Sequence, residues 1–475
     1  MRRIFDDAGY RAEQIQQRLG TSDRALAEGP DRPVYLRRLG EGDALALLIR
    51  MLLIDVAVVR ELAEGILGVD AVALLERVGL LETAEEGRVD GTVRVVPHEH
   101  LLIASDRYAE GHADHVAAVH GPSATLSHLT VRRPVGSALD VGTGNGIQAL
   151  LAAAHADRVV ATDINERALA FTAFNAALNG IDTVELRRGS FFEPVAGEQF
   201  DLVVTNPPYV ISPESSFLFR DSGLPKDAVS EQVARALPAH IAEGGFGSVM
   251  VSWVLENDDD DPTSRPASWV EGSGCDALII HTGSDEPLPI AAQWNRDVRT
   301  DATAYAEAID RWLEYFEKEG IREIGFGCIV LRRRAPESFP NWIRTTRMPA
   351  RRLQRSSDQL ERMFEVHHYL AGLEDERELL DARLRVAEDV MVEQRLRLGD
   401  NGWQLRAAEM SITRGMRFTA ELDDVTTSLV LALDGTRSVR DALPDPGDSH
   451  TQESLDEMGL RLARQMLEVG FLRRA

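Results

Sequence analysis

The chain has 475 residues, of which 44% are hydrophobic and 27% are charged, and its net charge at pH 7 is −25. This length exceeds what one hydrophobic core usually serves, so we expect two or three domains of ordinary globular composition. The acidic balance argues against extensive nucleic-acid binding, because such a surface repels phosphate backbones unless basic residues are concentrated locally.

The sequence predicts neither a signal peptide nor a membrane span. No apolar run follows the two arginines of MRRIFDDAGY. The most hydrophobic stretch, residues 44–59, is interrupted by Arg50 and Asp55 and is too short to span a bilayer, which predicts a core helix. Cys275 and Cys328 lie in apolar runs typical of buried strands, where we expect reduced thiols. These features together predict a cytoplasmic protein.

Residues 1–107 are predicted to form a helical, winged-helix-like N-terminal domain. Leucine and valine recur at helical spacing through residues 43–60 and 70–81, and residues 91–106 show the alternation of a short hairpin. A polar connector that contains several histidines, residues 108–133, follows this domain.

Residues 108–348 alternate between strand and helix patterns. Helical patterns include ERALAFTAFNAALNG and RWLEYFEKEG, and a charged insert at 256–274 is expected to be a mobile loop. Such alternation predicts a Rossmann-like, doubly wound α/β sheet that binds its ligand at the carboxyl ends of the strands. The expected strands are 137–142, 158–164, 184–189, 200–206, 246–253, 275–282 and 323–332.

Residues 349–475 are predicted to form a separate C-terminal domain. Its first part is rich in arginine, glutamate and leucine and predicts long helices. A turn at 432–443, followed by a terminal helix and the short strand FLRR, predicts a winged-helix-like α+β module.

A glycine-rich turn and a downstream aspartate predict a nucleoside cofactor. In ALDVGTGNG, an apolar strand runs into Gly142, Gly144 and Gly146, which allow positive φ angles and let a ligand lie against bare backbone. About twenty residues further on, Asp163 ends the next strand, where its carboxylate can accept hydrogen bonds from both ribose hydroxyls. The candidate cofactor-binding residues are Asp140, Gly142, Thr143, Gly144, Asn145, Gly146, Asp163, Ile164, Ser190, Phe191 and Asn206.

The tetrapeptide Asn206-Pro207-Pro208-Tyr209 decides between cofactors, because it offers no hydride chemistry. The two prolines stiffen the chain after the strand and fix the directions of its carbonyls. If the Asn206 side-chain oxygen and the Pro207 carbonyl accept both N–H groups of a conjugated amide or amine, the lone pair of that nitrogen becomes available. Tyr209 can stack on the planar acceptor. These four residues are therefore the candidate catalytic residues.

Several other groups admit two interpretations. Ser123 and Thr125 in the connector either close over the cofactor or cap a helix. His98 with His100, and the group His112, Asp114 and His115, lack further ligands at suitable spacing, so we expect solvated loop histidines and no metal.

The segment from Arg344 to Arg355 is a basic cluster in an acidic protein. It either pairs with carboxylates of the chain, including those of the acidic insert, or contacts phosphates. Contact with a nucleic acid would then involve Arg344, Arg351 and Arg352.

Residues 137–253, about a quarter of the chain, resemble the class I S-adenosylmethionine-dependent methyltransferases that carry the NPPY signature. LDVGTGNG, TDINERALAFTAFNAALNG and FDLVVTNPPYV are especially similar to the HemK-type enzymes, which methylate a glutamine side-chain amide in peptide release factors. The resemblance implies S-adenosylmethionine as cofactor, a seven-stranded sheet whose last strand is antiparallel, and an amino nitrogen as acceptor. It also implies that Asp140 can face the methionyl ammonium group, besides capping the glycine turn.

Two features depart from the HemK-type pattern. Ser190 stands where those chains usually have an acidic residue, and residues 210–229 replace the Glu/Gly-rich stretch that shapes their glutamine site. Base N-methyltransferases that act on guanine in ribosomal RNA or on adenine in transfer RNA use related NPP motifs. The resemblance therefore transfers the cofactor and the reaction type, but not the substrate.

Three hypotheses follow for the function. The first is an N-methyltransferase for a planar amide or amine, with a protein glutamine or another non-nucleic substrate favoured by the acidic charge. The second is an RNA or DNA base methyltransferase that uses the terminal modules and the arginines of 344–355. The third is a non-catalytic regulator that senses S-adenosylmethionine, against which the intact Asn206 and Tyr209 argue.

Overall fold

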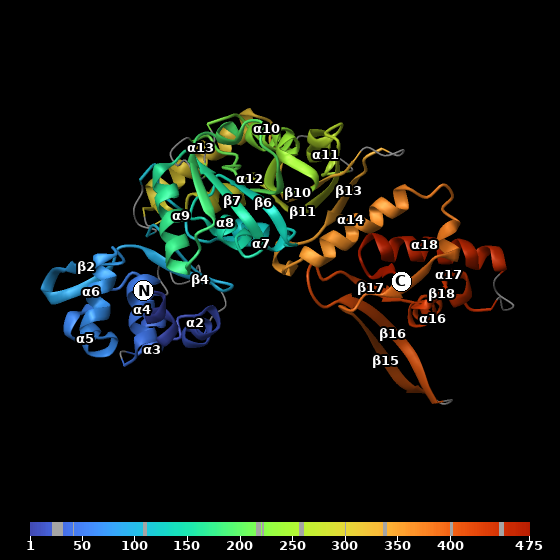
Figure 1. Cartoon of the computed structure of the whole chain (residues 1–475), viewed down its shortest axis with the longest axis horizontal. Coiled ribbons are helices and arrows are strands. Elements are labelled where there is room, and N and C mark those ends of the chain that lie inside the picture. Colours follow the sequence, from blue (N-terminus) through green and yellow to red (C-terminus); the bar gives the residue numbers. More distant parts are fainter. Residues whose placement is uncertain are drawn as a thin grey trace. The chain divides into compact units, whose positions relative to one another are not determined.

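The computed structural model describes residues 1–20, 32–40, 42–107, 112–214, 220, 223–255, 261–299, 301–335, 340–399, 402–445 and 451–475. The chain divides into two compact units (Figure 1). The first unit comprises residues 1–124 and 134–233, and the second comprises residues 125–133 and 234–475. The domain boundaries predicted near residues 107 and 348 fall inside these units and stay predictions.

The N-terminal part of the first unit begins with helices. The predicted core helix at 44–59 is shorter than expected, because α4 ends at Leu52 and the chain turns at Asp55, which has a φ of 54°. The Asp43 carboxylate caps α4 by accepting a hydrogen bond of 2.8 Å from the Ala46 amide. The helix bounds are Arg2–Asp7 (α1), Ala12–Leu19 (α2), Arg32–Leu39 (α3), Ala44–Leu52 (α4), Arg60–Leu67 (α5) and Val69–Arg77 (α6).

Two small sheets accompany these helices. Strands β1 (Val58–Val59), β2 (Leu81–Ala84) and β3 (Arg88–Gly91) pair in the order β1-β3-β2, with α5 and α6 between the first two strands. This combination of helices and a three-stranded wing is the arrangement expected for a winged-helix-like module. The hairpin predicted within 91–106 is confirmed as β4 (Arg94–His98) and β5 (Leu101–Ser105).

Eight strands form one mixed sheet in the order β13-β11-β12-β10-β9-β6-β7-β8. In the first unit, β6 pairs in parallel with β7 and β9, and β7 pairs in parallel with β8. In the second unit, β12 is antiparallel to β10 and β11. The bounds are Val135–Val141 (β6), Ala156–Asp163 (β7), Val184–Arg188 (β8), Phe200–Thr205 (β9), Ile241–Leu255 (β10), Cys275–Asp285 (β11), Glu323–Arg333 (β12) and Ile343–Arg347 (β13).

This sheet confirms the Rossmann-like architecture with an antiparallel strand that the sequence predicts. All seven expected strands are present, and β13 is an eighth strand within the segment interpreted as a basic cluster. The predicted thiols are also confirmed, because Cys275 and Cys328 are free and buried. Burial raises their pKa values to about 11 and about 12.

Helices accompany the strands of the sheet. Helix α9 begins after the Asn165 cap and ends at Gly180, whose φ of 69° suits a left-handed C-cap. The expectation of a loop over 256–274 is wrong for its second half, where α11 forms and buries Trp269; residues 256–260 lie outside the described residues. The bounds are Gly121–Leu129 (α7), Ile147–Ala152 (α8), Glu166–Asn179 (α9), Ala228–Ala236 (α10), Ser264–Val270 (α11), Pro287–Trp294 (α12) and Ala302–Lys318 (α13).

The C-terminal region combines helices with two three-stranded sheets, of order β18-β14-β19 and β15-β16-β17. The helix bounds are Ser357–Ala371 (α14), Glu378–Asp381 (α15), Asp424–Ala432 (α16), Val439–Ala442 (α17) and Gln452–Glu468 (α18). The strand bounds are Arg383–Val386 (β14), Val390–Gly399 (β15), Gly402–Ile412 (β16), Thr419–Leu422 (β17), Asp434–Ser438 (β18) and Leu472–Arg474 (β19).

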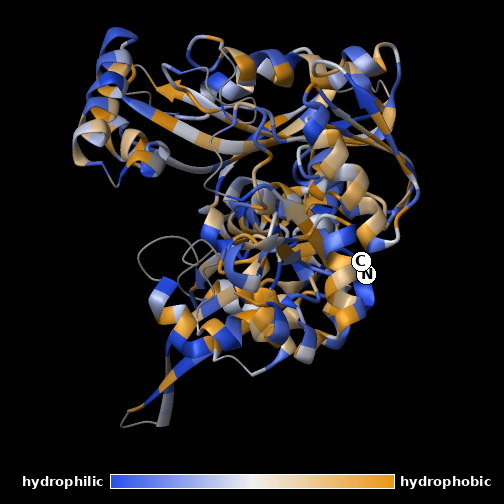
Figure 2. Cartoon of the chain, turned by 90° about the vertical axis from the view of Figure 1, so that its left-hand side faces the viewer, coloured by the Kyte–Doolittle hydropathy of each residue, from blue (hydrophilic) through white to orange (hydrophobic). Residues whose placement is uncertain are grey.

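The prediction of long helices after residue 349 is right for α14 and wrong for the segments that form β14, β15 and β16. Arginine, glutamate and leucine favour helices in isolation. Here Met410 and Ile412, at alternate positions, are buried in the C-terminal core, and burial of one face of a strand overrides that preference. Hydrophobic and hydrophilic residues are interspersed along the helices (Figure 2). In α18, the buried residues include Leu455, Ala463 and Leu467. In the part of the chain that the structure describes, no helix is long and apolar enough to cross a membrane.

Candidate active site

Strand register brings the candidate site residues to one edge of the sheet. Val141, the last residue of β6, is the partner of Thr162 in β7 and of Thr205 in β9. Because these strands are parallel, Gly142, Asp163 and Asn206 follow at the same carboxyl edge. The Thr205 hydroxyl also donates a hydrogen bond of 2.9 Å to the Val141 carbonyl, which fixes the relative height of the two strand ends.

The glycine turn exposes backbone. Gly142, Gly144 and Gly146 have φ angles of 68°, 58° and 84°, which a residue with a side chain rarely adopts. A Cβ atom on Gly142 or Gly144 would meet nothing within 4 Å, so open space lies beside both. A Cβ on Gly146 would come within 2.9 Å of the Thr172 side chain in α9. Gly146 therefore serves close packing against α9, and Gly142 and Gly144 leave room for a ligand.

Asp140 stabilises this turn from beneath. Its Oδ2 accepts hydrogen bonds from the Thr143 hydroxyl at 2.7 Å and from the Ala149 amide at 3.0 Å. The side chain is buried, and burial, with a smaller contribution from the charge of Asp163, raises the pKa of Asp140 to about 7. From the sequence we expected Asp140 to cap the amides of the glycine turn; the contacts instead join it to the Thr143 hydroxyl of the turn and to the Ala149 amide within α8.

The Asp163 carboxylate accepts hydrogen bonds from the loops that follow β6 and β7. Its Oδ2 accepts a hydrogen bond of 2.9 Å from the Gly144 amide, and its Oδ1 accepts one of 2.8 Å from the Asn165 amide. Burial raises its pKa. A carboxylate has about four acceptor positions, so these two bonds leave capacity for a ligand. Ile164, the next residue, is an apolar side chain with 54% of its surface exposed at this edge.

The loop after β8 carries Ser190 and Phe191. Phe192 is buried in the core, whereas Phe191 is half-buried and has a φ of 43°, a conformation that is strained for a residue with a side chain. Gly189 is confined as well, because a Cβ there would lie 2.5 Å from the Pro194 ring. These constraints direct the two neighbouring phenylalanines into different environments.

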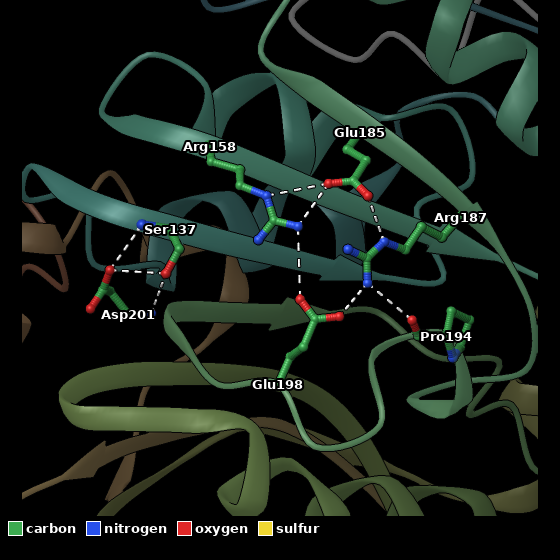
Figure 3. A network of polar contacts seen from close by, with 7 residues as sticks. All are labelled: Ser137, Arg158, Glu185, Arg187, Pro194, Glu198 and Asp201. Atoms are coloured by element: carbon green, nitrogen blue, oxygen red, sulfur yellow. Dashed lines mark hydrogen bonds and ion pairs between the residues drawn. The ribbon is translucent and has the colours of Figure 1, made fainter.

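An ion-pair network supports this loop (Figure 3). Arg187 donates to the Pro194 carbonyl at 3.1 Å and forms ion pairs with Glu185 and Glu198. Arg158 joins the same carboxylates, at 2.7 Å to Glu185 and 3.7 Å to Glu198. The network ties β7 and β8 to the end of the loop, so it holds the segment that carries Ser190 and Phe191.

Side-chain amides hold the connector near the glycine turn. Asn145 donates to the Ala117 carbonyl at 2.9 Å, Asn165 to the Asp114 carbonyl at 2.8 Å, and Gln148 to the Ser123 carbonyl at 2.8 Å. The sequence interpretation named Asn145 but missed Asn165 and Gln148. The sequence signal for them is their position, two residues after Asp163 for Asn165 and within the helix that follows the glycine turn for Gln148.

The NPPY segment contains a buried acceptor with no partner. Among the described residues, nothing donates a hydrogen bond to the Asn206 Oδ1, although this atom is buried. The Pro207 carbonyl, the other expected acceptor, already receives a hydrogen bond of 2.8 Å from the Tyr209 amide, and Tyr209 is buried. An unsatisfied buried acceptor costs free energy, so a donor from outside the described residues would stabilise this segment.

Other predicted groups lie elsewhere. His98 is buried in β4, so the expectation of a solvated loop histidine is wrong for it, whereas His100 is exposed. Ser123 and Thr125 are buried in α7. Within the described ranges, no three His, Cys, Asp or Glu residues form a group that could hold a metal ion. Arg344, Arg351 and Arg352 are exposed and belong to the second unit.

Known families match two regions of the chain. Residues 115–219 match the model of the methyltransferase small domain. Residues 361–472 match a model described as a domain of unknown function, DUF7782. The first match covers the glycine turn, Asp163 and Asn206, and it confirms the methyltransferase-like region that the sequence predicts.

Several of the matching relatives are glutamine methyltransferases by name. Over 143 residues the chain is 35% identical to a release factor glutamine methyltransferase of Xylella fastidiosa, a match that covers 27% of this chain and 50% of that protein. Over 164 residues it is 31% identical to a ribosomal protein uL3 glutamine methyltransferase of Bradyrhizobium diazoefficiens, covering 32% of this chain and 48% of that protein. The chain thus spans about half the length of the curated relatives it matches.

Similarity to solved structures is low. The YcgJ protein of Bacillus subtilis is 14% identical, with a TM-score of 0.31, over 46% of this chain and 99% of that one. The fold assignment therefore rests on the strand order of the sheet and on the family match.

The pKa of Asp140 predicts a specific dependence of stability on pH. Because the folded state raises this pKa from 3.8 to about 7, the folded state holds the proton more tightly than the unfolded state. The stabilisation by the protonated carboxyl is present below the unfolded pKa and is lost as the pH rises to about 7. Relative to Asp140→Asn, which cannot ionise, the wild type should lose at most about 4 kcal/mol of unfolding free energy over this window. Urea unfolding of both proteins measures this difference, and parallel pH profiles would contradict the burial of an ionisable Asp140.

Proposed function

We propose that this chain is an S-adenosylmethionine-dependent N-methyltransferase that acts on a planar amide nitrogen, with a protein glutamine side chain as its substrate. The buried, unpartnered Asn206 Oδ1 carries this proposal. It lies at the same sheet edge as the open backbone of Gly142 and Gly144. A donor from the substrate would satisfy it.

The residues at this edge fit the cofactor. Gly142 and Gly144 leave space beside their backbone, the Asp163 carboxylate retains acceptor capacity for ribose hydroxyls, and Ile164 offers an exposed apolar side chain for an adenine ring. Asp140, when ionised, is suited to an ammonium group. S-adenosylmethionine supplies an activated methyl group on a sulfonium centre.

The residues of the chain orient the acceptor nitrogen. We assign the Asn206 Oδ1 to one N–H of the substrate amide and the second lone pair of the Pro207 carbonyl to the other. Two accepted hydrogen bonds draw the nitrogen toward tetrahedral geometry and free its lone pair from conjugation. No general base is required, because the proton becomes acidic only after the methyl group has been transferred. We assign Tyr209 to flank the planar acceptor.

The substrate class is proposed from the relatives. Both are named for methylation of a glutamine in a protein. In this chain the segment after NPPY differs from the HemK-type pattern, and it is anchored by an ion pair of 3.3 Å between the buried Arg220 and Glu214. We therefore propose a protein glutamine as substrate and leave the target protein to experiment.

The nucleic-acid alternative has one observation in its favour, the exposure of Arg344, Arg351 and Arg352. Against it, the final helices of the two winged-helix-like modules carry carboxylates, including Asp70 in α6 and Glu453 in α18, where contact with phosphates would require cations. The third alternative, a regulator that only senses the cofactor, gives no reason to keep an unsatisfied Asn206.

Asn206→Ala separates catalysis from folding. Loss of one hydrogen bond that strengthens in the transition state should lower single-turnover methyl transfer by roughly a hundredfold or more, with cofactor affinity unchanged. Because the wild-type acceptor is buried and unsatisfied, the variant should be at least as stable as the wild type. Asn206→Asp, which keeps an acceptor but adds a negative charge, should also be slow. Wild-type rates in Asn206→Ala, or a large loss of stability, would exclude the proposed role.

Asp163→Ala tests the cofactor site. The wild type should bind S-adenosylmethionine and S-adenosylhomocysteine in the micromolar range, about −8 kcal/mol. Removal of the carboxylate should weaken both by roughly 1 to 3 kcal/mol. Asp157→Ala, an exposed residue near the start of the same strand, is the matched control and should bind normally. Isothermal titration gives both values, and tighter binding of a nicotinamide dinucleotide would refute the assignment.

Labelling of a cell lysate with tritiated S-adenosylmethionine identifies the substrate class. Protease should remove the macromolecular label, and RNase or DNase should leave it. The triple variant Arg344→Glu, Arg351→Glu and Arg352→Glu should label the same material at the same rate, because these arginines are not assigned to the substrate. Loss of the label on nuclease treatment, together with inactivity of the triple variant, would support the nucleic-acid alternative instead.

A further inference from the structure

The hairpin formed by β15 and β16 extends beyond the helices of the C-terminal region (Figure 1). At its base, Met410 and Ile412 are buried in the C-terminal core, and Val392 packs against that core. Towards its tip the strands continue without a covering element among the described residues. Burial of residues at the base therefore accounts for the formation of the hairpin. It does not account for the identity of the residues at the tip.

One face of the tip is apolar and exposed. Leu398 and Trp403 are direct partners across the hairpin, and Leu396 lies on the same face of β15, two residues along the strand. The exposed fractions are 54% for Leu396, 63% for Leu398 and 69% for Trp403. Three large apolar side chains gathered on one projecting face mark an interaction surface rather than scattered exposure.

The opposite face of the tip is cationic. Arg395 and Arg397 alternate with the leucines along β15, and Arg406 lies on β16; all three are exposed. None of them forms an ion pair with any carboxylate that the structure describes. The glutamates of the two strands, Glu393 and Glu409, are paired with each other nearer the base. In a chain with a net charge of −25, three exposed arginines at the tip that form no ion pair with a described carboxylate favour an acidic partner.

The outer edge of β15 is open. The order of this sheet is β15-β16-β17, so β15 has a partner on one side only within the described part of the chain. The strand is 10 residues long. A long edge strand presents alternate N–H and C=O groups that another extended chain can pair with.

We propose that the edge of β15 is a docking site for an extended acidic segment of a partner protein. The segment adds as a further strand, places apolar side chains beside Leu396, Leu398 and Trp403, and places carboxylates beside Arg395 and Arg397. One occupant thus uses the open backbone, the apolar face and the cationic face together. This surface is independent of methyl transfer, so its test does not depend on the proposed activity.

Two other possible occupants of the β15 edge would explain fewer of these surface features. A second copy that pairs antiparallel through its own β15 would bring Arg395 and Arg397 beside the same residues of its partner, and like charges in register are unfavourable. A single-stranded nucleic acid would use Trp403 for stacking and the arginines for phosphates, but it would leave the open edge and the two leucines without partners.

The test measures fluorescence anisotropy of labelled probes with the full-length protein. The main probe is a peptide of alternating valine and glutamate, matched to the 10-residue length of β15. The control probes are the same peptide with alternate N-methylated residues, which cannot add as a strand, a valine and lysine peptide, and an oligouridine RNA. The valine and glutamate peptide should bind in the micromolar range and the others should not bind.

Variants locate the surface. Arg395→Glu with Arg397→Glu, and separately Leu398→Ser with Trp403→Ser, should weaken binding of the acidic peptide by roughly tenfold or more. Arg351→Glu with Arg352→Glu changes the charge by the same amount at exposed residues of the same unit, and should leave the affinity within about twofold. All substituted side chains are exposed, and thermal unfolding checks that each variant is folded.

Four results would overturn the proposal. They are equal binding of the N-methylated peptide, binding of the RNA in place of the acidic peptide, no binding of the acidic peptide by the wild type, and equal effects of the two arginine pairs. Because no probe or readout involves S-adenosylmethionine, failure here leaves the proposed methyltransferase activity untouched.

Discussion

The parallel register of the strands around Val141 is the constraint on which the candidate site depends. Val141 is paired with Thr162 on one side and Thr205 on the other, so the glycine turn, Asp163 and Asn206 emerge together. A shift of one residue in either pair would turn alternate side chains to the opposite face of the sheet and separate these groups. The Asp163 carboxylate then joins the loops through the amides of Gly144 and Asn165. The site is therefore fixed mainly by backbone geometry.

Burial of two polar groups near the site, those of Asp140 and Asn206, lowers the stability of the folded state. Asp140 is buried enough for its pKa to rise to about 7, and the buried Asn206 Oδ1 has no donor among the described residues. The nearby Asn175 of α9, by contrast, is fully engaged: it bonds both the Ala104 amide and its carbonyl in β5, and also the Asn145 carbonyl of the glycine turn. Other buried side-chain atoms also lack a partner among the described residues, but the Asn206 Oδ1 lies at the same sheet edge as the glycine turn, and a substrate donor is the physical reason for it that we favour.

The second unit shows how one composition can support different structures. Arginine, glutamate and leucine occur in both α14 and the β15–β16 hairpin. In α14, Leu360, Met363 and Phe364 recur at helical spacing and are buried. In the hairpin, apolar residues alternate with arginines, and only the residues at its base reach the core. The exposed tip is then free to present one apolar and one cationic face, a property that composition alone does not reveal.

The local sequence determined the strands and turns of the methyltransferase-like region, because apolar runs ending in glycine, aspartate or NPP specify strand ends through short-range sterics. It also predicted that Gly142, Asp163 and Asn206 lie together, and the strand register brings them to one edge of the sheet. Tertiary packing decided the rest. The same glycine motif left room beside Gly144 but packed Gly146 against Thr172, and a strand expected to carry a solvated histidine buried His98. Neighbours distant in sequence decide whether Asn206 has a hydrogen-bond donor and whether β15 and β16 form strands or helices, so no local pattern predicts either outcome.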